Sequence, residues 1–212
     1  MIRVNANGTV PSGEAGVHRV DAKRETPRVE PRERILSTAY ELFARRGIQN
    51  VGVDELIRRS GVAKATFYHH FPSKEALGLA FLERHDAHWT TEFTRSEAVK
   101  ACTTPTEQLL AVFEVFDNWL RRDDFQAGSF IKVLLEMGPN HPLGQASIQY
   151  LAKTRTMVET LAERADLREP AEFASSFHLL LKGALVSATE GDLQAPQRAK
   201  RMAAALIADH RK

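Results

Sequence analysis

Residues 61–75 have the sequence GVAKATFYHHFPSKE, in which a glycine and a proline enclose about two turns of predicted helix. Gly61 suits the residue of positive φ in a sharp turn between two helices, and Pro72 ends the segment. Placing the residues between them at 100° intervals brings Phe67 and Phe71 to the same side of the helix. We therefore expect this aromatic side to face the protein interior.

The opposite side of this short helix carries Ala65 and His69, with Thr66 and Tyr68 beside them. These side chains are short or can form hydrogen bonds, as in a helix that lies in the major groove of DNA. The alternative is a short core helix in an all-α bundle that carries two aromatic residues by chance. The segment alone does not separate the two interpretations, but the residues before it favour the first.

The composition is that of an ordinary globular protein with one or two domains. The 212 residues carry a net charge of +2, but residues 1–84 hold 14 Lys and Arg against 10 Asp and Glu, whereas residues 85–212 hold 15 against 17. The basic part contains the short helix, which suits a nucleic-acid partner there. A solvated charged surface explains so small an excess almost equally well.

Export and membrane insertion are not expected from this sequence. No apolar run approaches the roughly 20 residues of a membrane-spanning helix, and the first residues lack an apolar signal segment. The single cysteine, Cys102, excludes an internal disulfide and a zinc site made of several cysteines. We therefore expect a cytoplasmic protein that does not contact a membrane.

Two further helices are predicted before the short one. Pro31 suits a first helical position, and apolar residues at helical spacing continue to Arg46 and Gly47, where cations and a glycine end the helix. Apolar residues within 53–57 form one side of a second, shorter helix. Three helices in this order, with a glycine turn before the last, make a helix-turn-helix unit whose last helix contacts DNA.

These residues carry a resemblance to a known family. The segment from Arg34 to Leu77 resembles the DNA-binding domain of TetR/AcrR-family transcriptional regulators, and blocks 128–142 and 180–192 are similar to the C-terminal half of that family. The N-terminal resemblance is carried by LFARRG at 42–47, VDELI at 53–57, GV at 61–62, FYHHF at 67–71 and SKEAL at 73–77. The sequence departs from the family where Ser or Thr usually caps the second and third helices, because Gly52 and Ala63 occupy these positions. Losing the cap oxygen costs about 1 kcal/mol at an alanine and a few tenths at a glycine.

The periodicity and the resemblance together predict an all-α fold of about nine helices. Residues 1–29 lack apolar periodicity and are expected to form a disordered arm, residues 30–76 the helix-turn-helix DNA-binding domain, and residues 77–212 a helical domain for effector binding and dimerisation. The helices expected after the short one cover residues 74–100, 105–121, 128–137, 143–165, 170–190 and 196–210.

The resemblance implies a homodimer that binds a palindromic double-stranded DNA operator and controls transcription, most simply as a repressor. The segments 170–190 and 196–210 could pair with their copies in a second subunit, since the first is apolar almost all round and Gly183 permits close approach. They could equally fill the core of one subunit. The residues predicted to reach base edges are Ala65 and His69, with Lys64 and Thr66 at the margin. Those predicted to contact phosphates are Tyr68, Lys74 and His70, the first two matching phosphate contacts of the family.

The resemblance also implies a pocket for a small-molecule effector among residues 74–165 and part of 170–190. Its candidate lining residues are Phe81, His85, Trp89, Phe113, Phe116, Phe130 and His178. For each of them singly, core packing is the simpler explanation of an aromatic stripe at helical spacing. A bound effector would favour a conformation in which the helix from residue 74 holds the two DNA-binding domains at the wrong separation.

No catalytic site, metal site or cofactor is expected. His85 and His88 are three residues apart, yet no cluster of Cys or further His completes a metal site. The sequence has no glycine-rich phosphate loop, nucleophile elbow or HExxH motif, so an all-α enzyme is the less favoured alternative. A DNA-binding regulator without a small-molecule effector is the other alternative.

Overall fold

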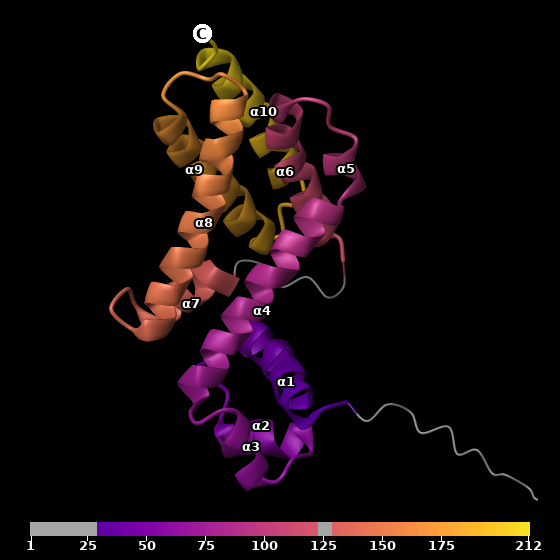
Figure 1. Ribbon diagram of the computed structural model, residues 1–212, viewed down its shortest axis with the longest axis vertical. Coiled ribbons are helices and arrows are strands. Elements are labelled where there is room, and N and C mark those ends of the chain that lie inside the picture. Colours follow the sequence, from indigo (N-terminus) through magenta and orange to yellow (C-terminus); the bar gives the residue numbers. More distant parts are fainter. Residues whose placement is uncertain (1–28, 123–128) are drawn as a thin grey trace, which may run out of the picture.

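The computed structural model describes residues 29–122 and 129–212, and every regular element in this part of the chain is an α-helix (Figure 1). The all-α prediction is thereby confirmed for the described residues, whereas nearly all of the expected arm lies outside them. The helices are α1 (Pro31–Arg46), α2 (Val53–Ser60), α3 (Lys64–His70), α4 (Lys74–Arg95), α5 (Glu97–Lys100), α6 (Pro105–Leu120), α7 (Ser129–Met137), α8 (Pro142–Arg164), α9 (Pro170–Thr189) and α10 (Ala195–Asp209).

Helices α1, α2 and α3 lie together at one end of the molecule, and α4 leads from them toward the other helices (Figure 1). Two glycines turn the chain between these helices. Gly47 has a φ of 80° after α1, and Gly61 has a left-handed conformation with a φ of 64° after α2. Gly52 and Ala63 occupy the N-cap positions of α2 and α3, as the sequence predicted. The helix-turn-helix unit therefore forms with two N-caps that lack a side-chain acceptor.

The helix after α3 is shorter than expected. We predicted one helix over 74–100, but α4 ends at Arg95 and the four-residue helix α5 follows after Ser96. Ser96 has a φ of −58° and a ψ of 129°, which is outside the helical region and breaks the hydrogen-bond ladder there. The described residues therefore hold ten helices where about nine were expected.

Two clusters of buried apolar side chains stabilise the fold. One lies among α6, α8, α9 and α10 and includes Phe113, Phe173 and Phe177. The other joins the helix-turn-helix unit and α4 to Phe130 of α7 and Leu143 of α8. A Cβ added at Gly78 of α4 would lie only 3.0 Å from the Leu143 side chain, so α4 and α8 pack closely. The DNA-binding domain predicted for 30–76 thus shares its core with the larger domain.

The side chains of Thr104 and Glu107 cap the start of α6. The Thr104 hydroxyl accepts from the Glu107 backbone N–H at 3.2 Å, and the Glu107 carboxylate accepts from the Thr104 backbone N–H at 3.0 Å. This reciprocal capping box satisfies two free donors at the helix start. Within residues 29–122 and 129–212, every helix falls short of the length and apolar character that crossing a membrane requires.

Candidate nucleic-acid interface and internal cavity

The short helix α3 turns its two phenylalanines inward, as predicted. Phe67 is completely buried and Phe71, which follows the last residue of α3, is 3 % exposed. The two ring centroids are 6.5 Å apart, and Phe67 also contacts the ring of Tyr68 edge-on. Burying two aromatic rings fixes the rotation of this seven-residue helix about its axis. The other side of α3 therefore faces solvent.

The residues predicted to contact DNA lie on or beside that outer side. Tyr68 is 42 % exposed, Lys64, Ala65 and His69 are also exposed, and Thr66 and His70 are half-buried. Lys74, at the start of α4, differs from this pattern because its ammonium group donates to the Gln49 carbonyl at 3.2 Å. Partial burial lowers the pKa of Lys74 from its usual value, and the Glu136 carboxylate opposes that shift. Lys74 must leave or share this carbonyl to bind a phosphate.

Helix α7 holds the turn between α1 and α2 through one carboxylate. Glu136 accepts from the backbone N–H of Ile48 at 3.0 Å and of Gln49 at 2.5 Å, one bond to each oxygen. A Cβ added at Gly47 would lie 2.9 Å from both carboxylate oxygens, so a larger residue here would displace the carboxylate. Because 87 or 88 residues separate the partners, no local sequence pattern indicates this contact.

Two further hydrogen bonds join α7 to the same region. Lys132 donates from its ammonium group to the carbonyl of Ala44, in the last turn of α1, at 2.9 Å. The Gln49 side-chain amide donates to the Glu136 carbonyl at 2.9 Å. We call the contact made by Lys132 and Glu136 with residues 44–49 the α7 clamp. It connects the helix-turn-helix unit directly to the larger domain.

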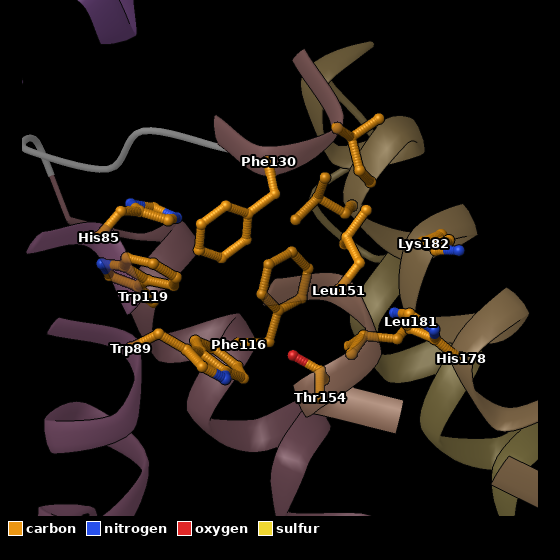
Figure 2. A pocket seen from close by; sticks show the side chains of 12 residues that line it. His85, Trp89, Phe116, Trp119, Phe130, Leu151, Thr154, His178, Leu181 and Lys182 are labelled. Carbon is orange, nitrogen blue, oxygen red and sulfur yellow. The ribbon is translucent and has the colours of Figure 1, made fainter. Parts of the chain in front are cut away.

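A cavity of about 70 Å³ lies inside the larger domain (Figure 2). Its walls come from α4, α6, α7, α8 and α9. The lining residues are His85, Trp89, Phe116, Trp119, Phe130, Ile131, Leu151, Thr154, His178, Leu181, Lys182 and Leu185. Figure 2 shows the rings of Trp89, Trp119 and Phe130 on one side, and His178 and Lys182 on the other.

Five of the seven residues predicted to line an effector pocket lie in the wall of this cavity, namely His85, Trp89, Phe116, Phe130 and His178. The other two, Phe81 and Phe113, are buried in the core outside its lining. Phe81 packs against the rings of Tyr40 and Phe43, and Phe113 packs against Phe177 at 5.0 Å. The polar lining residues Thr154 and Lys182 were not predicted, because neither belongs to an aromatic stripe.

His85 connects the cavity to the DNA-binding domain. Its Nδ1 lies 3.1 Å from the Tyr40 hydroxyl of α1, a hydrogen-bond distance, and its ring stacks on Trp119 with centroids 5.6 Å apart. Burial lowers the pKa of His85 to about 4, with a further contribution from His88. His85 is therefore neutral at pH 7. No group of three or more His, Cys, Asp or Glu residues among the described residues could hold a metal ion, so the pair of His85 and His88 gains no further ligand there.

Comparison with known proteins agrees with this geometry. Residues 35–81 match the family model described as bacterial regulatory proteins, TetR family. The helix-turn-helix unit therefore matches that of the TetR family. The matched residues run from the second turn of α1 to Phe81 of α4 and so contain all of α2 and α3.

Several transcriptional regulators are similar to parts of this chain. The transcriptional repressor NemR of Escherichia coli is 43% identical over 65 residues, which cover 31% of this chain and 33% of NemR. The transcriptional activator FasR of Mycolicibacterium smegmatis is 36% identical over 97 residues, which cover 46% of this chain and 43% of FasR. These matches therefore span less than half the length of the curated relatives.

The structural likeness extends further along the chain. A TetR-family transcriptional regulator from Streptomyces coelicolor superposes with a TM-score of 0.78 and 23% identity, over 86% of this chain and 96% of the other. At this identity the likeness shows that the two chains share a fold, including the helical domain after the helix-turn-helix unit. The relatives named here are all described as transcriptional regulators.

Proposed function

We propose that this protein is a homodimeric, DNA-binding transcriptional regulator of the cytoplasm. Its two α3 helices bind a palindromic operator, and a small molecule in the cavity releases them, as in a repressor. The observation that carries the proposal is the orientation of α3, with Phe67 and Phe71 buried and Tyr68 and His69 facing solvent. A helix held in this way by its apolar side can lie in a major groove.

A second subunit is needed because one helix of seven residues contacts too few base pairs for a specific site. A stripe on α9 and α10 suits the dimer contact. Leu179, Val186 and Met202 on these helices are 69 %, 44 % and 57 % exposed, which is unusual for large apolar side chains. Gly183 lies between the first two, and a Cβ built on it would meet no atom within 4 Å. This open, apolar stripe supports the pairing of α9 and α10 with their copies.

Helix α7 supplies a physical route from the cavity to the DNA-binding domain. Phe130 and Ile131 near its start line the cavity, while Lys132 and Glu136 form the α7 clamp. A cavity of about 70 Å³ is smaller than the roughly 300–1,000 Å³ of most ligand pockets. A ligand of ordinary size must therefore displace its walls. Movement of α7 would shift the turn between α1 and α2, so ligand and DNA would oppose each other's binding.

Selection from a random double-stranded DNA library tests the DNA-binding part of the proposal. The full chain should enrich a palindrome whose half-sites lie about one helical turn apart. The matched control is the double variant Tyr68→Ala and His69→Ala, whose changes are confined to exposed side chains and so leave the core intact. Enrichment of the same sequences by the control, or no enrichment by the natural chain, would contradict the proposed role of α3.

A further inference from the structure

The two walls of the cavity differ in chemistry. Helices α4, α6 and α7 contribute aromatic rings, including Trp89, Phe116 and Phe130. Helices α8 and α9 contribute the Thr154 hydroxyl, the His178 imidazole and the Lys182 ammonium, whereas the polar atoms of the aromatic wall belong to the rings of His85, Trp89 and Trp119. Figure 2 shows the Thr154 oxygen directed toward the ring of Phe116, with His178 and Lys182 beyond Leu181. A molecule bound between these walls meets an apolar surface on one side and a cation on the other.

These polar groups are not occupied by contacts with the described protein. Across residues 29–122 and 129–212, the side chains of Thr154, His178 and Lys182 form no hydrogen bond or ion pair. Other hydroxyl groups on the same helices bond to their own helix, as Ser147 does to the Leu143 carbonyl at 2.9 Å. Hydrogen-bonding groups that are left open in a largely apolar cavity need a partner from outside the protein.

The charge on this side is positive. Burial, together with the nearby cations of Lys182 and Arg155, lowers the pKa of His178 to about 4, so the imidazole is neutral at pH 7. Within the described chain no acidic side chain lines the cavity. An anion placed here would gain the attraction of Lys182 and donors from its neighbours, whereas a ligand cation would be repelled by Lys182.

We propose that the cavity binds a small organic carboxylate with an aromatic or branched-alkyl body. The carboxylate lies against Lys182 and Thr154, and the body lies among Trp89, Phe116 and Phe130. This inference rests on the proposed function, because it names the chemical class of the effector. The small volume of about 70 Å³ limits the body to a few carbon atoms unless the walls move apart.

The chain contains a built-in probe for this test. Its only two tryptophans, Trp89 and Trp119, both line the cavity, so their fluorescence reports on what enters it. Benzoate, phenylacetate and isovalerate are titrated into the DNA-free full chain, beside the neutral amides of the same acids and the cation benzylamine. The carboxylates should saturate the signal and bind at least about tenfold more tightly than their amides, because the neutral amide oxygen can still accept from Lys182 but lacks the negative charge that Lys182 attracts.

Two variants separate the charge from the shape of the cavity. Lys182→Met keeps the length of the side chain and should remove the preference for carboxylates while the amides still bind. Lys100→Met removes an exposed lysine of α5, far from the lining, and should behave as the natural chain does. Retained carboxylate preference in Lys182→Met would show that another group binds the anion, and would overturn the assignment.

The remaining outcomes are equally decisive. Equal binding of acids and amides, tighter binding of benzylamine, or no saturable binding of any acid at millimolar concentration would each overturn the ligand class. If the protein selects a palindrome but shows no carboxylate preference, the inference fails and the proposed function stands. If carboxylates bind at the cavity but no DNA is selected, the site stands and the proposed function fails.

Discussion

Replacing Glu136 by glutamine should loosen the α7 clamp without changing the shape of the side chain. In the natural chain each carboxylate oxygen accepts one backbone N–H, from Ile48 at 3.0 Å and from Gln49 at 2.5 Å. In Glu136→Gln an NH2 group, which can only donate, replaces one of the two carboxylate oxygens. One of the two N–H groups then faces another donor and loses its partner.

The size of the effect follows from these bonds. A hydrogen bond to a charged acceptor contributes about 1.5–3 kcal/mol, and water can partly replace it at the exposed Gln49. We therefore expect Glu136→Gln to lower the free energy of unfolding by about 2 kcal/mol. For a chain of this length, that loss corresponds to a fall of about 4–8 °C in the midpoint of thermal unfolding.

Two measurements check this prediction. Circular dichroism gives the midpoint, and amide hydrogen exchange should accelerate at Ile48 and Gln49 while the amides of α10 keep their rates. Glu163→Gln is the matched control, because Glu163 is exposed on α8 and its side chain has no partner among the described residues. A midpoint equal to that of the control, together with unchanged exchange at Ile48 and Gln49, would refute the clamp as a stabilising contact.

Three further predictions concern DNA, the dimer and pH. Tyr68→Phe should weaken binding to all DNA sequences alike by roughly three- to tenfold, whereas His69→Ala should cost about 1–3 kcal/mol of preference at one base pair per half-site. Fluorescence anisotropy on single-base operator variants measures both effects. An unchanged preference after His69→Ala would mean that α3 presents another side to the DNA. Leu179→Glu should raise the dimer dissociation constant at least about tenfold by burying a charge; sedimentation that shows an unchanged dimer would move the interface away from α9. Because burial lowers the pKa of His85 to about 4, the neutral imidazole contributes fully to the free energy of unfolding above pH 6.5. Between pH 6.5 and 4 the natural chain should lose about 3 kcal/mol of this free energy relative to His85→Asn. Denaturant titrations measure both proteins, and parallel pH profiles would show that this pKa is not lowered.

Local signals accounted for much of the fold. Pro31 begins α1, Thr104 and Glu107 cap α6, and Gly61 takes the left-handed conformation that its place between two helices requires. Each of these features depends on residues within one or two turns of helix, so a chain inspected without its fold already contains them. The break at Ser96 escaped prediction because neither a glycine nor a proline marks it in the sequence.

The cavity shows where such signals end. Phe113 and Phe116 are three residues apart on α6 and belong to the same apolar stripe, yet Phe113 packs against Phe177 and Phe116 lines the cavity. Periodicity identifies the stripe but not the helix that covers each part of it. Thr154 and Lys182 gave no signal at all, since a polar residue becomes a binding group only where the surrounding helices enclose it.

The sequence by itself determined that this chain is helical, that it carries a helix-turn-helix unit of the TetR type, and that Phe67 and Phe71 turn inward. Those properties follow from spacing along one helix and from turn residues next to it. Only the tertiary structure decided that Glu136 holds the turn after α1 and which aromatic side chains enclose the cavity. Both depend on the packing of helices that lie tens of residues apart, because contact between them is set by the arrangement of the whole bundle rather than by any local pattern.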